Sequence, residues 1–278
     1  MIKILVDSAS DYPIEEAVEK GLIFVPLTIL IGGNSYADGI DLSRDSFYKI
    51  LTESGEFPKT SQPSPQSFAE IFKGAKENGD EIICLLISSA LSGTCQSAQL
   101  AKNMVNYDGI YIVDTLAATI NIKVMADYAR KLIKEGLSAA QIVEKIETVK
   151  SKVKVIASLD TLEYLRRGGR IGRAAAAIGE MANLKPIITV EEEGVVGICG
   201  KCLGKNKAIN FIRKHMAEVE LDPDFPVYTV YTYDPTNCEI FEEKIAQDNI
   251  HIDQRMQIGA TIGTHVGPGA FGLIYVKK

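Results

Sequence analysis

Residues 81–96, which read EIICLLISSALSGTCQ, contain the pattern that decides the fold. Residues 82–87 form a nearly unbroken apolar run rich in branched side chains, which is typical of a strand buried on both faces of a parallel sheet. The polar segment 88–94 follows at once, and apolar residues then recur at helical spacing over 95–105. We therefore predict a strand, a polar corner and a helix in immediate succession.

The polar corner has the chemistry of an anion-binding site. The first backbone N–H groups of a helix have no partners within the helix, and the helix dipole adds partial positive charge there. Gly93 would allow a ligand to approach closely, and the hydroxyls of Ser92 and Thr94 would add donors. Ser92 could equally serve only as the N-cap of the helix, because serine is a common N-cap residue. The corner alone leaves both interpretations open.

The same succession of strand, polar corner and helix recurs along the chain. Strand patterns at 3–6 and 110–113 each lead into an aspartate, Asp7 and Asp114, and then into a helical pattern. Strands that alternate with helices predict a doubly wound parallel sheet with right-handed crossovers. Because ligands of such sheets bind at the carboxyl ends of the strands, we expect Asp7, Ser92 and Asp114 to lie along one edge of an α/β domain.

Further apolar runs predict the remaining strands. Residues 23–31 indicate one strand, and the polar turn at 32–35 indicates a hairpin after it. Residues 153–157 begin another strand. After it, the regular alternation of strand and helix patterns gives way to a different arrangement. Residues 185–190 and 194–198 are expected to pair as strands around an acidic turn.

Composition and charge exclude several classes of protein. The chain has 278 residues, of which 46% are hydrophobic and 24% charged, so it can form a substantial core and is expected to be ordered nearly throughout. A net charge of -6 argues against a general nucleic-acid binder. The N-terminal apolar stretch is too short for a signal peptide, and no run approaches the roughly 20 residues that span a bilayer. We expect a cytoplasmic protein.

The cysteines predict neither a disulfide framework nor a metal site. The chain has five, an odd number, and they are scattered through segments with strand and helix patterns. Cys199 and Cys202 have CxxC spacing, but no second pair accompanies them. We expect no metal ion and no cofactor.

The segment 58–65, PKTSQPSP, is a stiff loop, because its three prolines prevent a helix before residue 66. Ser64, followed by Pro65, is the expected cap of the next helix. Thr60 and Ser61 then have a less evident structural role than Ser64. We therefore predict that Ser61 faces a ligand.

Residues 166–173, RRGGRIGR, form the one concentrated basic segment, in which four arginines stand among three glycines. Arginines on a glycine-rich loop suit bidentate contact with a phosphate or with an acidic partner surface. The alternative is a solvated surface loop. The small residues of 174–182 are expected to form a helix.

Residues 258–272 are rich in glycine and include His265, one of only three histidines. We expect a loop between two apolar strands, because glycine clusters punctuate structure. A lone histidine is often structural, but loops are where binding groups concentrate, so we predict a site role for His265.

In combination, five segments resemble the DegV family of bacterial fatty-acid-binding proteins. They are Asp7-Ser8, TSQPS at 60–64, SSALSGT at 88–94, the stretch 162–172, and GTHVGPG at 263–269. The match is collinear over the whole chain. The resemblance implies an N-terminal doubly wound α/β domain, placed at 1–155, and a C-terminal α/β domain with its own sheet, placed at 156–278. A long-chain fatty acid would be buried between them.

The resemblance further implies a role in fatty acid phosphorylation. Such proteins act as the acyl-binding, non-catalytic subunit of a bacterial fatty acid kinase, whose separate ATP-binding subunit makes an acyl-phosphate for phospholipid synthesis. Transient membrane contact is compatible with this role. By motif position, the carboxylate would be held by Ser61, by Ser92 with the backbone of Gly93 and Thr94, and by His265. Arg170 and Arg173 would face the kinase subunit or the acyl-phosphate.

Two other functions are compatible with parts of the sequence. A serine hydrolase could use Ser92, His265 and an aspartate such as Asp7 or Asp114, but Ser92 is not in a GxSxG elbow. A phosphosugar or nucleotide binder could use the arginine loop. No P-loop or dinucleotide glycine fingerprint follows any predicted strand.

Overall fold

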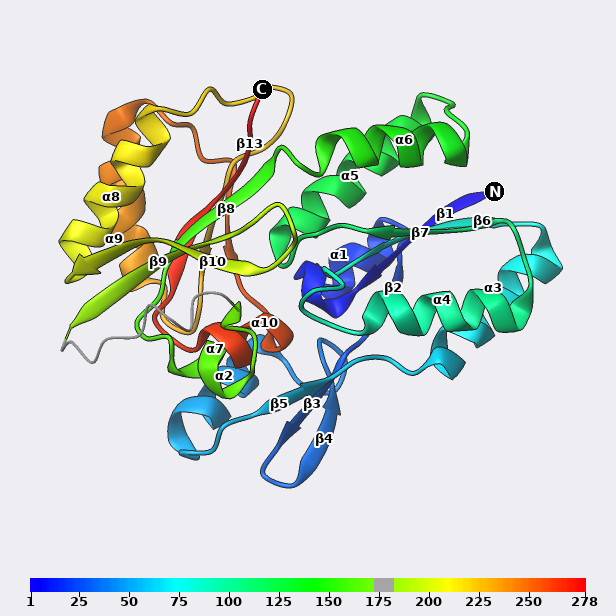
Figure 1. The fold of residues 1–278 in the computed structure, drawn as a ribbon, viewed down its shortest axis with the longest axis horizontal. Helices are drawn as coiled ribbons and strands as arrows, with labels where there is room; N and C mark the ends of the chain where they lie inside the picture. Colours follow the sequence, from blue (N-terminus) through cyan, green and yellow to red (C-terminus); the bar gives the residue numbers. More distant parts are fainter. Residues whose placement is uncertain (173–182) are drawn as a thin grey trace.

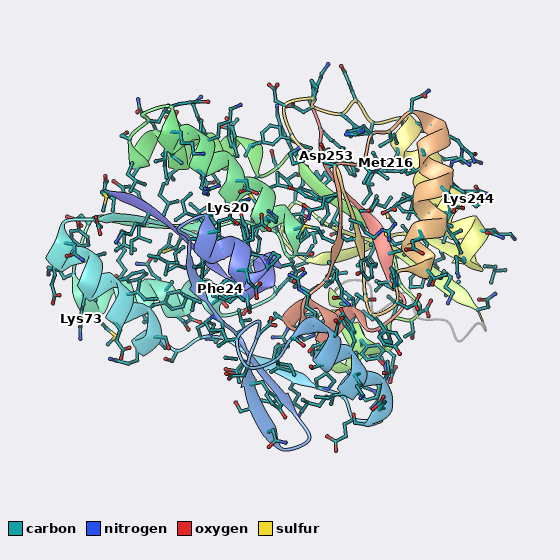
Figure 2. The ribbon with its side chains drawn as sticks, turned by 180° about the vertical axis from the view of Figure 1, so that it is seen from behind. Lys20, Phe24, Lys73, Met216, Lys244 and Asp253 are labelled. Atoms are coloured by element: carbon teal, nitrogen blue, oxygen red, sulfur yellow. The ribbon has the colours of Figure 1, made fainter. Side chains whose placement is uncertain are left out.

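Two sheets lie side by side in the computed structural model, which describes residues 1–172 and 183–278 (Figure 1). Arg173 and the helix predicted for 174–182 lie outside the described residues. Lys73 and Lys244, which belong to helices on the two outer faces, stand at opposite sides of the molecule (Figure 2). Within the described ranges, no helix is long and apolar enough to cross a membrane.

The first sheet is parallel, with the strand order β2-β1-β6-β7. Its strands are β1 (Ile2–Asp7), β2 (Ile23–Val25), β6 (Glu81–Leu86) and β7 (Ile110–Asp114). β6 lies between β1 and β7, and its side chains alternate between two hydrophobic cores. Ile83 and Leu85 face one core, whereas Ile82, Cys84 and Leu86 face the other. Burial on both faces explains the unbroken apolar run that predicted this strand.

Helices cover both faces of the parallel sheet, so the doubly wound α/β fold is confirmed (Figure 1). One face packs against α3 (Pro65–Asn78) and α4 (Thr94–Val105), and the other against α1 (Ile14–Glu19), α5 (Ile120–Lys134) and α6 (Ala139–Val149). The predicted cap of α3 is present, because Ser64 Oγ accepts a hydrogen bond from the Ser67 N–H at 3.2 Å. A short 3-10 helix, η1 (Ser8–Ser10), follows β1.

The second sheet has six strands in the order β10-β9-β8-β13-β11-β12, all antiparallel except β11 and β12. They are β8 (Val153–Ser158), β9 (Leu184–Val190), β10 (Val196–Leu203), β11 (Tyr228–Tyr231), β12 (Gln254–Gln257) and β13 (Phe271–Val276). Its outer face packs against α8 (Lys205–Ala217) and α9 (Thr236–Ile245), the latter followed by η3 (Ala246–Asp248). Its inner face packs against α5, which therefore lies between the two sheets.

A third, three-stranded sheet replaces the single strand predicted for residues 23–31. The chain leaves the parallel sheet after Val25 and enters a separate antiparallel sheet at Thr28. Pro26 stands between them and has no backbone N–H for a continuous ladder, so the prediction of one strand was wrong. The small sheet consists of β3 (Thr28–Ile31), β4 (Asn34–Ala37) and β5 (Lys59–Ser61). The predicted hairpin turn joins β3 to β4.

Three short helices lie beside the small sheet (Figure 1). They are α2 (Arg44–Glu53), α7 (Glu163–Arg167) and α10 (Ala260–Val266). Residues from β3 and α2 share a buried cluster with Ala260 of α10. The N-terminal and C-terminal parts of the chain therefore interlock here. The second sheet begins at Val153, whereas the boundary predicted from the sequence fell after residue 155.

Candidate functional site

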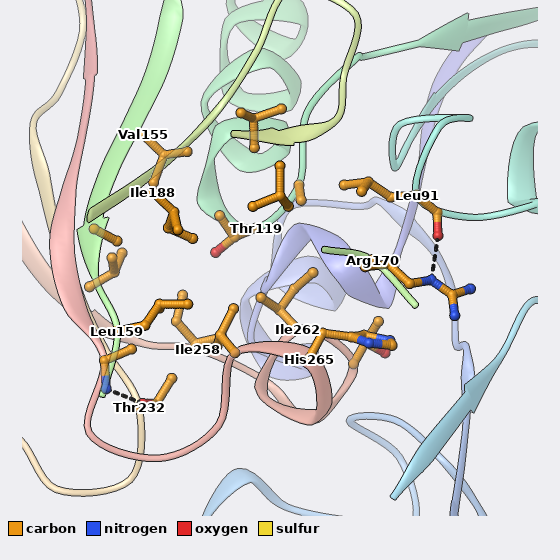
Figure 3. Close-up of a pocket in the computed structure, with 18 of the residues that line it drawn as sticks. Leu91, Thr119, Val155, Leu159, Arg170, Ile188, Thr232, Ile258, Ile262 and His265 are labelled. Carbon is orange, nitrogen blue, oxygen red and sulfur yellow. Dashed lines mark hydrogen bonds between the residues drawn. The ribbon is translucent and has the colours of Figure 1, made fainter. Parts of the chain in front are cut away.

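A cavity of about 100 Å³ lies between the two large sheets (Figure 3). We call it the inter-sheet cavity. Aliphatic side chains make up most of its wall and come from both halves of the chain: Leu27, Ile87, Leu91 and Ala118 from the first half, and Val155, Ala157, Leu159, Ile188, Val190, Val196, Val230, Ile258, Ile262, Val266 and Ala270 from the second. Such a wall excludes water and suits an apolar ligand.

Polar side chains gather at one end of the inter-sheet cavity. Arg170 and His265 lie together beside Leu91, whereas Val155 and Ile188 lie at the other side of the view (Figure 3). Thr60 and Ser92 also line the cavity. Thr60 belongs to the same end as His265, because its Oγ1 is 2.9 Å from His265 Nε2. The cavity is therefore amphipathic along its length.

The corner at residues 88–94 forms part of the polar end. Gly93 is the N-cap of α4, and no side chain within residues 1–172 and 183–278 caps this helix, so the interpretation of Ser92 as the N-cap was wrong. Ser92 Oγ instead lies 2.9 Å from Thr94 Oγ1, the hydroxyl of a buried residue. Ser88 Oγ donates to the Gly194 carbonyl at 2.8 Å and ties the corner to the turn between β9 and β10.

Two aspartates, at the ends of the strands on either side of β6, shape this corner, as their expected position on one edge implies. Asp7 Oδ2 accepts from the Ile87 N–H at 2.8 Å, and Asp114 Oδ1 accepts from the Ser89 N–H at 3.1 Å. Burial raises the pKa of Asp7 to about 7. Both carboxylates therefore hold the backbone of the corner in place, which is a structural role.

The loop before α3 contributes Thr60 rather than Ser61 to the cavity. Both residues belong to β5, where successive side chains point to opposite faces. Thr60 lines the cavity, whereas Ser61 is exposed. The next residue, Gln62, fills the space beside Gly93, where a Cβ would lie 2.0 Å from Gln62 Oε1. Gln62 also donates to Ser97 Oγ at 3.0 Å and so fixes the loop on α4.

His265 lies on helix α10, so the loop predicted for residues 258–272 was wrong over this segment. Its Nδ1 is buried against Gly168 and has no hydrogen-bond partner among the described residues. Burial, together with the charge of Arg170, lowers the pKa of His265 to about 4. The imidazole is therefore neutral near pH 7 and can donate one hydrogen bond without adding charge.

Gly263 explains why a glycine-rich segment forms a helix here. A Cβ at Gly263 would lie 2.6 Å from Tyr48 Oη and 2.8 Å from Phe47 Cε1, both on α2. The glycine serves close packing between helices rather than a turn. The sequence alone does not distinguish these two uses of glycine.

We expect Gly263→Ala to lower the free energy of unfolding by about 1–3 kcal/mol, because the methyl group overpacks a buried helix contact. Gly74→Ala is the matched control, since Gly74 lies in α3 and no atom of the described part of the chain lies within 4 Å of an added Cβ. Relief of the helix penalty of glycine should stabilise that variant by about 1 kcal/mol. Urea denaturation measures both changes, and an unchanged Gly263→Ala variant would contradict the packing role.

Arg170 is the arginine of the basic segment that lines the inter-sheet cavity. Its Nε donates to the Leu91 carbonyl at 3.1 Å and its Nη1 to the Gly168 carbonyl at 2.6 Å (Figure 3). Arg166 and Arg167 instead pair with Glu163, and Arg167 also stacks 3.7 Å from the Phe57 ring centroid. Within the described part of the segment, only Arg170 lies beside the cavity.

The hydrogen bonds of Ser92 and His265 do not form a hydrolase triad. Ser92 contacts Thr94 and His265 contacts Thr60, while Asp7 and Asp114 hold the corner backbone. A triad needs the serine, the histidine and the acid in one chain of hydrogen bonds. The two cysteines of the CxxC pair are not bonded to each other. Cys199 and Cys202 are free thiols, one exposed and one buried.

The chain is similar to known proteins over its full length. The family model for the uncharacterised DegV family matches residues 1–278. A DegV domain-containing protein of Caldanaerobacter subterraneus is 35% identical over 280 residues, which cover 100% of this chain and 99% of the relative.

Solved structures with the same fold include two fatty-acid-binding proteins. A DegV family protein from Thermus thermophilus, described as binding fatty acid, superposes with a TM-score of 0.89 at 33% identity, covering 100% of this chain and 99% of the other. A stearic acid-binding protein from Eubacterium ventriosum gives a TM-score of 0.88 at 29% identity, with the same coverage. The chain belongs to the DegV family.

Proposed function

We propose that this protein binds a long-chain fatty acid, with the acyl tail in the inter-sheet cavity and the carboxylate at its polar end. One observation carries the proposal: a mostly aliphatic cavity has Thr60, Ser92, Arg170 and His265 together at one end. A fatty acid has the same division, with one anionic end and an apolar tail. The fatty acids bound by the Thermus and Eubacterium relatives support this ligand class.

The tail supplies most of the affinity in this proposal. Burial of hydrocarbon gains about 0.8 kcal/mol per methylene, so a tail of roughly sixteen carbons gains on the order of 10 kcal/mol before ordering costs. A single hydrogen bond contributes about 1 kcal/mol net. The polar end therefore has the task of orienting the ligand.

The carboxylate contacts follow from the positions of the donors. Thr60 and Ser92 supply hydroxyl donors, His265 acts on this group through its hydrogen-bond contact with Thr60, and the backbone N–H groups of Gly93 and Thr94 stand at the first turn of α4. Thr60 takes the place that the sequence assigned to Ser61, whose side chain is exposed. If His265 Nε2 donates to Thr60, the hydroxyl proton of Thr60 is free to reach a carboxylate oxygen.

We also propose that the protein presents the bound acid to a separate ATP-binding kinase subunit, which forms an acyl-phosphate for phospholipid synthesis. The family resemblance motivates this step. Arg170 stands at the polar end, where a phosphoryl group would arrive, and Arg173 belongs to the same basic segment. The protein itself contributes no catalytic group and acts in the cytoplasm.

Organic extraction of the purified protein, followed by mass spectrometry, tests the ligand class. We expect one long-chain fatty acid per chain, because a cavity of about 100 Å³ has no room for a second tail. A delipidated sample should take up added palmitate to the same ratio. A protein that stays empty, and that neither takes up fatty acid nor supports its phosphorylation by a kinase subunit, would contradict the proposal.

A further inference from the structure

The N-terminus of α10 is held by two buried carboxylates from the other half of the chain. Asp11 Oδ1 accepts from the Gly259 N–H at 2.7 Å. Asp38 Oδ2 accepts from the Thr261 N–H at 3.0 Å and from the Thr261 hydroxyl at 2.5 Å. The N-cap of the helix is Gly259, which has no side chain to serve this purpose. Residues far away in sequence therefore do the capping.

Two further residues fix the chain just before α10. Arg44 donates from Nη1 to the Gln257 carbonyl at 2.7 Å and from Nη2 to the Asp11 carbonyl at 2.7 Å. Tyr48 Oη donates to the Ile258 carbonyl at 3.0 Å. We call Asp11, Asp38, Arg44 and Tyr48 the α10 clamp. All four belong to the first 48 residues, whereas α10 lies near the end of the chain.

The α10 clamp holds a helix that builds the polar end of the cavity. Thr261, Ile262, His265 and Val266 of α10 all line the cavity. His265 stands one helical turn after Thr261, the residue that Asp38 holds by two hydrogen bonds. The helix has only seven residues, so it depends on tertiary contacts for its place. A small shift at its first turn would move the imidazole relative to Thr60.

We propose that Asp11 and Asp38 are positioning residues for the carboxylate site: by capping α10 they place His265 against Thr60 at the polar end of the cavity. The inference rests on the proposed function for its ligand. Buried carboxylates at a helix N-terminus suit this task, because they accept from the free N–H groups and complement the helix dipole. Both side chains are at least 96% buried, which restricts them to one geometry.

The three histidines of the chain provide the test. In protein labelled with ¹⁵N-histidine, Asp38→Ala should shift the ring signals of His265 and raise its pKa from about 4 towards the ordinary value near 6.5. Asp38→Asn keeps an acceptor oxygen for the Thr261 N–H and should restore most of the parent behaviour. His215 and His251 lie outside α10 and should not respond. Affinity for palmitate should fall about tenfold more than affinity for its methyl ester in Asp38→Ala.

Asp127→Asn controls for loss of a buried ionic contact elsewhere. Asp127 pairs with Lys123, whose side chain is 2% exposed, and the other ion pairs of these two residues, to Glu16, Lys20 and Arg130, also lie outside α10. This variant should lose stability without changing the His265 signals. Should Asp38→Ala fail to fold, Thr261→Val removes the hydroxyl contacts with Asp38 and Ser8, keeps the N–H bond to Asp38, and should shift His265 in the same direction.

A folded Asp38→Ala protein whose His265 signals and pKa match the parent would overturn the positioning role. So would an equal change in Asp127→Asn. This test is independent of the proposed function, because the histidine measurement needs no lipid. A His265 response in a protein that binds no fatty acid would support the clamp and reject the ligand.

Discussion

Replacement of Ala157 by phenylalanine should weaken fatty acid binding by on the order of 100-fold while the protein stays folded. Ala157 lies on β8 and lines the inter-sheet cavity. A phenyl ring there takes the space of several methylenes of the tail. If about four methylenes are displaced, the binding free energy weakens by about 3 kcal/mol. This raises the dissociation constant by on the order of 100-fold. Displacement of a fluorescent fatty acid from delipidated protein measures the effect.

Ile156→Phe is the matched control for this change. Ile156 is the neighbouring residue of β8, but it belongs to the core on the outer face of the sheet, under α8 and α9. The added volume there should cost about 1–3 kcal/mol of stability and leave the affinity for fatty acid within about threefold of the parent. Binding of palmitate by Ala157→Phe with parental affinity would mean that the tail does not occupy this cavity.

Removal of two donors at the polar end should impair phosphorylation more than binding. In Ser92→Ala combined with His265→Ala, each lost hydrogen bond costs about 1 kcal/mol, so affinity should fall roughly tenfold to thirtyfold. The tail remains buried, but the carboxylate is no longer held in one orientation. The rate of acyl-phosphate formation at saturating lipid, with a kinase subunit present, should fall by on the order of 100-fold.

Ser89→Ala serves as the control for the double variant. Ser89 stands in the same corner, but it is exposed and bonds to Asp114 rather than lining the cavity. Its loss should leave both binding and phosphorylation near the parent values. An equal fall of affinity and phosphorylation in the double variant would contradict the division of labour between tail and head group.

The sequence predicts the parts of this fold that depend on local pattern. The strand, corner and helix around residues 81–105 were confirmed, because apolar periodicity reports directly on burial in a parallel sheet. The cap at Ser64 was confirmed for a similar reason, since its partner lies three residues away. The break at Pro26, by contrast, changes which sheet the chain joins, and the apolar run around it hides this change.

The sequence predicted which segments form the candidate site, but not which of their side chains line the cavity. The choice between Thr60 and Ser61 depends on how β5 pairs with β3, which is a tertiary fact. Asp11 stands in a short polar segment after β1, yet one of its partners is 248 residues away. Asp38 carries no pattern that links it to Thr261. A buried position for a charged residue is visible only once the two halves of the chain are packed together.

The direction of the bound fatty acid tests the central claim most directly. Two photoreactive fatty acids, one with a diazirine on the terminal carbon and one with a diazirine beside the carboxyl group, can be crosslinked to delipidated protein and mapped by peptide mass spectrometry. The account predicts that the terminal probe labels the peptides with Val155 or Ile188, and that the other probe labels those with Ser92 or His265 (Figure 3). The reverse pattern, or labelling confined to the outer helices α3 and α9, would contradict it.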